Sequence, residues 1–235
     1  MTAAEIIAEL RLLGRDSYKS VILKHGIKEP CFGVKIEDLK KIQKRIRKDY
    51  QLALDLYSTG IYDAQYLAGL IADDARMTKG DLQGWLAQAK SQPLCGNTVA
   101  WVAAESRYGW ELALEWIESK SESVAVAGWA TLSSLVSIKQ HAELDLSKLQ
   151  QLLLHVGRTI HKQPNRVRYA MNGFVIALGA SVRSLTGLAI QTAEKIGLVS
   201  VDMGDTSCQV PFAPDYIRKI EQRGNIGKKR KTTKC

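Results

Sequence analysis

The fold is decided by a stretch that reads Leu52-Ala53-Leu54-Asp55 and continues, 16 residues after Leu52, with Ala68-Gly69. The pattern returns 60 residues later as Leu112-Ala113-Leu114-Glu115, followed 15 residues after Leu112 by Ala127-Gly128. Two further helical patterns lie between the copies, so 60 residues hold two helix pairs of about 30 residues each, a length typical of helical solenoid units. The repeat therefore predicts stacked helix pairs, in which these small and apolar residues are packing positions.

The remainder of the chain has the same helical spacing of apolar residues. The predicted helices span about 3–13, 16–25, 35–50, 50–58, 62–73, 79–90, 96–106, 110–118, 122–138, 145–162, 164–180, 184–197 and 214–223. Residues 199–214 contain Gly204 and two prolines between β-favouring residues, which indicates an extended loop or a small hairpin. We therefore predict an all-α fold, an α-α superhelix with one domain over 1–223, a short irregular C-terminal segment and a basic C-terminal tail over 224–235.

The composition is that of a soluble, well-packed protein. Hydrophobic residues make up 46% of the chain, and the mean hydropathy is -0.14. No run approaches the roughly 20 apolar residues of a transmembrane helix, and Met1-Thr2-Ala3-Ala4-Glu5 lacks the basic-then-apolar order of a signal peptide. We expect a cytoplasmic monomer that does not associate with membranes.

The cysteines and histidines show no metal-ligand spacing. The four cysteines are Cys31, Cys95, Cys208 and Cys235. They form no Cys-x-x-Cys pair, and His155 and His161 are six residues apart, which does not place them on one helix face. We expect reduced thiols, no metal site and no cofactor.

Positive charge is concentrated at three places. The net charge is +9, and five of the cations lie in the C-terminal tail, at Lys228, Lys229, Arg230, Lys231 and Lys234. Lys40, Lys44 and Lys48 repeat every four residues and predict a stripe about 12 Å long at 1.5 Å per residue. Such a stripe can meet several phosphates, and it is equally typical of a solvated helix face.

A second basic group surrounds a helix-loop-helix. It consists of Arg158, Lys162, Arg166 and Arg168. The N-terminus of the 164–180 helix could add backbone donors to a phosphate, whereas Arg166 and Arg168 are two apart and cannot both point into one groove. The two groups and the tail together favour a nucleic-acid partner, held through its phosphate backbone and without sequence choice.

The chain resembles the AlkD-like DNA alkylation repair proteins. The resemblance rests on Phe32-Gly33-Val34-Lys35 followed by Leu39-Lys40-Lys41-Ile42, on the first copy of the repeat and on the helix that carries Leu82 and Trp85, and it covers most of positions 30–200. It implies a HEAT-like, armadillo-type solenoid that holds duplex DNA in a basic concave groove. Active members of that family are glycosylases that excise N3- or N7-alkylated purines by hydrolysing the N-glycosidic bond.

The family's functional residues can be sought one at a time. Its Trp-x-x-x-Asp should fall near 92–96, where this chain reads Gln92-Pro93-Leu94-Cys95-Gly96. Its arginine falls near Val126, and its second tryptophan lands near Phe174, which keeps only an aromatic ring. At least three of four positions are thus changed, and the standard glycosylase residues are not retained.

A different acid could still act. Glu105 follows Trp101 by one helical turn and reproduces an aromatic–acid pair. Trp101, Glu105 and Phe174 are therefore the candidate catalytic residues, although a tryptophan among apolar residues at helical spacing is more typical of a core position.

Three functions follow from these observations. The first is a DNA-binding protein of the DNA alkylation repair family that grips duplex or distorted DNA in a basic groove. The second is a glycosylase for alkylated purines with a rearranged active site. The third is a helical-repeat adaptor that binds an acidic protein partner.

Overall fold

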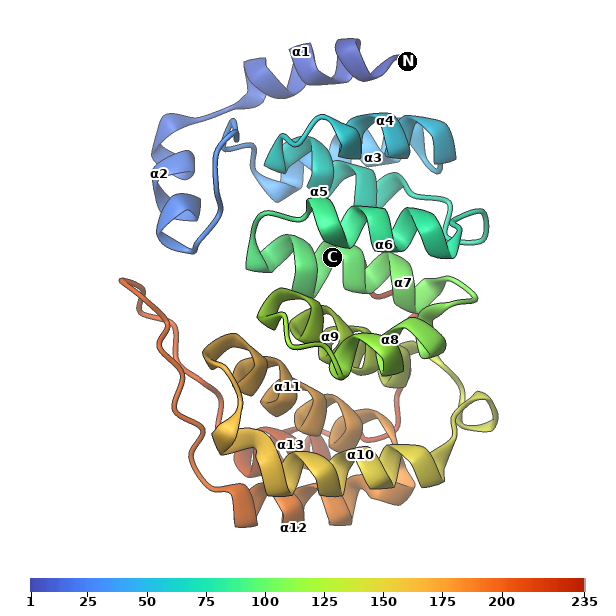
Figure 1. The fold of residues 1–235 in the computed structure, drawn as a ribbon, viewed down its shortest axis with the longest axis vertical. Helices are drawn as coiled ribbons and strands as arrows, with labels where there is room; N and C mark the ends of the chain where they lie inside the picture. Colours follow the sequence, from blue (N-terminus) through green and yellow to red (C-terminus); the bar gives the residue numbers. More distant parts are fainter. Residues whose placement is uncertain (235) are drawn as a thin grey trace. The chain divides into compact units, whose positions relative to one another are not determined.

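A computed structural model describes residues 1–234, and every regular element in that part of the chain is helical (Figure 1). The helices predicted from the sequence are confirmed, with shifts of a few residues at their ends. The described chain forms two compact units. The first consists of residues 1–108 with 204–206 and Lys234, and the second of residues 109–203 with 207–233.

The first unit is built around α5. Its helices are α1 (Ala3–Leu13), α2 (Asp16–Lys24), α3 (Ile36–Ile46), α4 (Tyr50–Ser58), α5 (Tyr62–Ile71), α6 (Lys79–Gln88), the π-helical turn η1 (Leu94–Val99) and α7 (Ala100–Glu105). Helix α5 is buried along its whole central length because α3, α4 and η1 all pack against it. The predicted 96–106 helix is therefore a π-helical segment that continues into α7.

The second unit is built around α9 and α11. Its helices are α8 (Gly109–Ile117), α9 (Glu122–Ile138), α10 (Leu146–Thr159), α11 (Asn165–Ser181), α12 (Thr186–Ile196) and α13 (Ala213–Gln222), with single 3₁₀ turns at His141–Glu143, Ile160–Lys162 and Arg183–Leu185. Helix α9 packs between α8 and α11, and α11 also contacts α12 and α13. Figure 1 shows α8 and α10 on the near side of this unit, with α9 and α11 behind them.

The glycines of the repeat lie where two helices approach closely. A Cβ at Gly69 of α5 would lie 2.4 Å from Thr98 Cγ2 in η1, and a Cβ at Gly128 of α9 would lie 2.7 Å from the Ile117 amide nitrogen of α8. Real Cβ atoms do not approach other atoms so closely, so only glycine fits at either position. The repeated residues are packing positions in both copies, as the sequence indicated.

The segment after α12 takes one of its two predicted forms. Residues 197–212 form a loop without strand pairing, so the small hairpin that the sequence allowed is absent from the described residues. No single described helix has the length and apolar character to cross a membrane. Helices α11 and α12, taken together with the turn between them, are long and apolar enough, but they are bent by 115° relative to each other.

The C-terminal segment is folded onto the helices and does not extend as a free tail. The Gly227 amide donates to Ala180 O at the end of α11, and the Arg230 amide donates to Ser137 O at the end of α9. Ile226 is buried, and Arg183 of the turn before α12 donates to its carbonyl oxygen. Cys235 lies outside the described residues.

Candidate nucleic-acid interface

The turn that precedes the basic helix α3 is fixed by a buried carboxylate. Asp63 of α5 accepts hydrogen bonds from the Phe32 and Val34 amides, at 2.6 and 2.8 Å. Between them Gly33 has φ of 75°, and a Cβ there would lie 2.7 Å from the Lys19 backbone. The Phe-Gly-Val-Lys sequence is therefore a structural device that sets where α3 begins.

Helix α3 ends earlier than the sequence predicted, and this breaks the basic stripe. Its last residue is Ile46, and Arg47 has φ of 66°, so the chain turns away before Lys48. Lys48 instead donates to the buried carboxylate of Asp74, at 3.1 Å. The prediction of a three-lysine stripe is wrong, because only Lys40 and Lys44 lie on the helix.

The surviving lysines of α3 are available to a ligand. Lys40 and Lys44 are exposed, and within residues 1–234 neither makes a side-chain hydrogen bond or an ion pair. Their neighbours on the same helix are occupied, since Lys41 pairs with Asp38 and Arg45 pairs with Glu9. One face of α3 therefore carries two uncompensated positive charges.

Asp74 gathers two lysines from distant parts of the chain. Lys234 Nζ lies 2.8 Å from its Oδ1 and also donates to Ala72 O just after α5, with only 7% of the side chain exposed. Burial lowers the pKa of Lys48, but the bond to Asp74 and the charges of Asp73 and Glu105 outweigh it and raise the pKa overall. Both lysines are thus committed to a structural ion pair.

The second basic group, Arg158, Lys162, Arg166 and Arg168, also contains both engaged and unpaired side chains. Glu122 accepts from the Arg166 amide at the start of α11, so an internal carboxylate takes the backbone donor that the sequence assigned to a phosphate. The Arg166 guanidinium contacts Met203 Sδ at 3.7 Å, and Arg168 donates to Asn165 Oδ1 at 3.2 Å. Arg166 and Arg168 are therefore both engaged within the fold.

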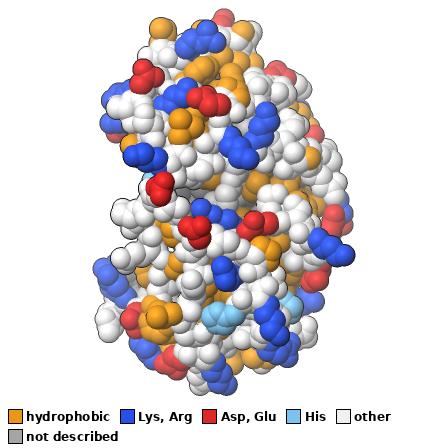
Figure 2. Space-filling model, turned by 60° about the vertical axis from the view of Figure 1, so that its left-hand side comes forward, with side chains coloured by type: hydrophobic (Ala, Val, Ile, Leu, Met, Phe, Trp, Pro, Cys, Tyr) orange, Lys and Arg blue, Asp and Glu red, His pale blue; other side chains and the backbone are white. Residues whose placement is uncertain are grey.

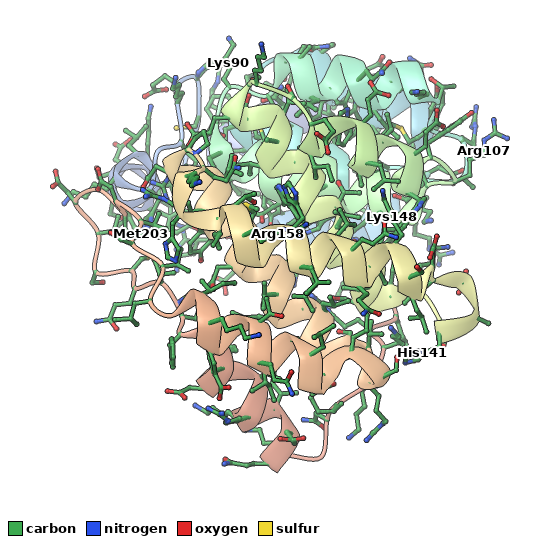
Figure 3. The ribbon with its side chains drawn as sticks, turned by 60° about the horizontal axis from the view of Figure 1, so that its bottom comes forward. Lys90, Arg107, His141, Lys148, Arg158 and Met203 are labelled. Atoms are coloured by element: carbon green, nitrogen blue, oxygen red, sulfur yellow. The ribbon has the colours of Figure 1, made fainter. Side chains whose placement is uncertain are left out.

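Arg158 and Lys162 remain uncommitted. Arg158 lies near the C-terminal end of α10 (Figure 3), and Lys162 ends the 3₁₀ turn that follows. Both are exposed, and no described residue forms a hydrogen bond or an ion pair with either side chain. They are the accessible part of this group.

The basic C-terminal run also contains both kinds of residue. Lys229 Nζ donates to Val136 O at 2.7 Å, and burial lowers the pKa of this amine. Lys228 donates to Asn225 Oδ1 at 2.6 Å. Arg230 and Lys231 are exposed, and no described residue pairs with their side chains.

The aromatic and acidic candidates lie mostly inside the core. Phe174 is fully buried and packs on Trp129, with 5.3 Å between ring centroids, so it cannot reach a sugar. Trp101 is 8% exposed and meets Tyr66 edge to face at 5.6 Å. Glu105 is half-buried at the end of α7. Burial removes Phe174 from the candidate site, and Trp101, the aromatic residue one turn before Glu105, is itself buried.

The positions that match the family's other functional residues carry no charged side chain. Gln92 and Gly96, which correspond to the ends of Trp-x-x-x-Asp, are half-buried, and Val126 is 1% exposed. Burial raises the pKa of Cys95 to about 11, so its thiol is protonated at neutral pH. Among residues 1–234, no cluster of three or more His, Cys, Asp or Glu side chains could hold a metal ion.

Sequence reasoning missed Lys195 of α12. It lines a pocket with Arg158 of α10, and no described residue pairs with it. The spacing of Leu188 and Lys195, seven residues apart, indicates that they share one helix face. It does not show that this face packs on α10. Figure 2 shows that lysine and arginine side chains are mixed with acidic ones over the face in view.

The fold and the distribution of cations define an all-helical, HEAT-like repeat protein with several uncompensated basic side chains. A family model described as DNA alkylation repair enzyme matches residues 6–198, and the chain belongs to that family. It is 30% identical over 232 residues to the uncharacterized protein Lin0241 of Listeria innocua, covering 96% of this chain and 100% of that one. It is 29% identical over 230 residues to the uncharacterized protein Lmo0209 of Listeria monocytogenes, covering 95% and 99%.

A solved structure is similar over the whole chain. It is described as representing a new family of proteins related to the HEAT-like repeat DNA glycosylases with affinity for branched DNA structures. The two are 34% identical, with a TM-score of 0.93 and coverage of 100% of both chains.

Proposed function

We propose that this protein binds branched or otherwise distorted duplex DNA through its phosphates and does not excise bases. The family and the solved structure with affinity for branched DNA support a DNA partner. The observation that carries the proposal is the set of exposed cations to which the fold offers no partner. Among the eleven residues that the sequence assigns to DNA binding, these unpaired cations are Lys40, Lys44, Arg158, Lys162, Arg230 and Lys231.

Unpaired cations matter because phosphate affinity comes from charge that the protein itself has not neutralised. A lysine already bound to a carboxylate releases little counterion from DNA, and breaking its ion pair costs free energy. Lys48 is paired with the Asp74 carboxylate, and the side chains of Arg166, Arg168, Lys228 and Lys229 donate to neutral acceptors within the protein, contacts that DNA would have to break. We therefore divide the eleven predicted DNA-binding residues into six that contact phosphate and five that support the fold.

The absence of base excision rests on what occupies the family's functional positions. An oxocarbenium-like transition state needs a negative charge or dipole aimed at the sugar. Gln92, Gly96, Val126 and Phe174 stand at the family's functional positions and have no charged side chain, so none can supply a negative charge. Glu105 is the remaining acid, and its neighbour Trp101 is committed to Tyr66.

Paired substitutions on one helix test the DNA-binding proposal. K40Q/K44Q removes two unpaired charges from α3, and K41Q/R45Q removes two ion-paired charges from the same helix. Binding to a four-way junction and to a linear duplex of equal length is measured by fluorescence anisotropy at about 50 mM salt. We expect K40Q/K44Q to weaken junction binding roughly tenfold and K41Q/R45Q to weaken it much less.

The same assay shows how the proposal could fail. An equal loss from both variants would mean that overall charge matters and position does not. No detectable binding by the unmodified protein would leave the adaptor for an acidic protein as the better function.

Base excision has a separate test. The protein is incubated with DNA that contains 7-methylguanine, and released base is quantified against an enzyme-free control. We expect no release above the control while junction binding persists. Release that is abolished by Glu105→Gln would establish the rearranged glycosylase instead.

A further inference from the structure

A pocket of about 240 Å³ lies between α10 and α12, within the second unit. Its lining comes from one face of each helix. Leu154, Gly157 and Arg158 are spaced i, i+3 and i+4 on α10, and Leu188, Gln191, Thr192 and Lys195 are spaced i, i+3, i+4 and i+7 on α12. Both sets therefore face the same space between the helices.

The pocket exists partly because α10 has glycine at position 157. A Cβ there would lie 2.9 Å from Thr192 Cγ2, so the backbone of α10 approaches α12 directly at this point. Leu154 and Leu188 supply apolar walls on either side. With 41% of Leu154 exposed, the apolar wall is open to solvent.

The rim of the pocket is cationic. Arg158 and Lys195 come from different helices, and no described residue forms an ion pair or a hydrogen bond with either side chain. The neighbouring acid on α12, Glu194, is occupied by Arg218 of α13. The pocket thus combines an apolar interior with two uncompensated positive charges.

We propose that this pocket binds a nucleoside monophosphate. Arg158 and Lys195 match the phosphate, since a guanidinium and an ammonium form charge-assisted hydrogen bonds to its oxygens. The leucines pack on the faces of the base, and the Gln191 amide both donates and accepts, as the edge of a base requires. The volume is below the usual range of pockets for drug-sized ligands, so the pocket holds at most one nucleotide.

Two sources present this chemistry, a free nucleotide or the unpaired end of a DNA strand. The site does not rest on the proposed grip on duplex DNA, because it shares only Arg158 with the residues assigned to that grip. A protein that failed to bind junction DNA would still bind a free mononucleotide here. The two proposals therefore fail separately.

Amide chemical shifts of ¹⁵N-labelled protein locate the site directly. The titrants are dAMP, deoxyadenosine, inorganic phosphate, and a hairpin duplex with or without a 5′-phosphorylated one-nucleotide overhang. We expect dAMP to perturb amides within 154–158 and 188–195 and to bind at least tenfold more tightly than deoxyadenosine or phosphate. The overhang hairpin perturbs the same amides if a strand end is the source, and the blunt hairpin does not.

Substitutions complete the test. Lys195→Gln removes one rim charge, and Leu188→Ala removes part of the wall, so each is expected to weaken dAMP binding roughly five- to tenfold. Lys148→Gln is the matched control, because Lys148 lies toward the other end of α10 and does not line the pocket (Figure 3). The spectrum of each variant shows whether it is folded. Perturbations elsewhere, no perturbation at millimolar dAMP, or equal losses from the control would overturn the proposal.

Discussion

Two glycines in the second unit show how differently one residue type can be constrained. Gly128 of α9 faces α8, where a Cβ would lie 2.7 Å from Ile117 N and 3.0 Å from Ala113 O. Gly173 of α11 has nothing within 4 Å of its Cβ position. Both lie inside helices, so the difference between them is packing alone.

Alanine substitutions at these two positions should have opposite effects. We expect Gly128→Ala to lower the free energy of unfolding by about 1–3 kcal/mol, because the neighbouring backbone cannot move aside. Gly173→Ala should raise it by about 0.5–1 kcal/mol, because alanine is the better helix former. Urea denaturation measures both. A Gly128→Ala variant as stable as the unmodified protein would mean that the repeat does not specify close helix packing.

Tyr50 and Asp81 form a titratable pair in the first unit. The Tyr50 hydroxyl donates to Asp81 Oδ2 at 2.9 Å, and Asp81 also accepts from the Thr78 amide in a capping box. Burial raises the pKa of Asp81, but these hydrogen bonds outweigh it and lower the pKa overall. The bond to Asp81 raises the pKa of Tyr50.

These shifts define a pH window for Tyr50→Phe. Asp81 contributes to folding stability above its unfolded pKa of about 4, and this contribution is lost as pH falls through the lower folded pKa. Tyr50 contributes to folding stability below its unfolded pKa of about 10, and this contribution is lost as pH rises through the higher folded pKa. We expect Tyr50→Phe to cost about 1 kcal/mol between those limits, given its partial exposure. Urea unfolding across pH checks this. A stability difference that stays the same down to pH 2 would contradict the assignment.

At the residue level, the sequence showed which residues are distinctive, but it did not show which distant residues they contact. Phe32-Gly33-Val34-Lys35 was distinctive enough to indicate the family, yet its physical reason is Asp63, about 30 residues away. Likewise, Lys48 has the same helical spacing as Lys40 and Lys44, but only the structure shows that it pairs with Asp74. Contacts between distant residues decide which charges are free, and helical spacing does not contain that information.

At the level of elements, helices were predictable because their apolar periodicity is strong, whereas their ends depend on neighbours. The predicted 35–50 helix is too long at its C-terminal end. The apolar pattern continues through Ile46, which is the last residue of α3. The chain turns there so that the Asp49 amide can donate to Ile71 O while its carboxylate caps α4. For residues 197–212 the sequence left a loop and a small hairpin open, and the loop is observed because the β-favouring residues have no strand partner among residues 1–234.

The C-terminal segment is the element whose role changed most. Its amides and Lys229 donate to Ala180 O, Ser137 O and Val136 O at the ends of α11 and α9. The last carbonyls of a helix have no partner within it, and positive charge is favourable there. The segment therefore stabilises helix ends in addition to carrying charge.

Truncation and charge removal should separate these two roles. Ending the chain at Asn225 removes buried Ile226 and these hydrogen bonds, and we expect it to lower the free energy of unfolding by about 3 kcal/mol. The R230Q/K231Q variant keeps the folded path, so its stability should change by less than about 0.5 kcal/mol while junction affinity falls. Thermal unfolding and anisotropy measure the two effects. A truncated protein of unchanged stability would restore the interpretation as a free basic tail.

For the whole molecule, the sequence indicated the scaffold and the partner class, but not which cations are accessible. Five of its eleven predicted DNA-binding residues are engaged within the protein. This matters for any measurement on the intact protein, because a count of eleven cations overstates how many can meet phosphate without breaking an internal contact. The effective number of phosphate contacts is what salt dependence reports.

The salt dependence of junction binding should therefore follow the six unpaired cations and not the eleven predicted ones. If all six meet phosphates, the logarithm of the association constant falls against the logarithm of salt concentration with a slope of about -5, whereas eleven contacts would give about -10. K40Q/K44Q should reduce the magnitude of the slope by about 2, and K41Q/R45Q should leave it nearly unchanged. Anisotropy titrations between about 50 and 200 mM salt provide the slopes. A slope near zero with retained binding would indicate an interface without phosphate contacts. A slope near -10 would mean that DNA breaks the internal hydrogen bonds and the Lys48–Asp74 ion pair and recruits the lysines and arginines that the folded protein holds.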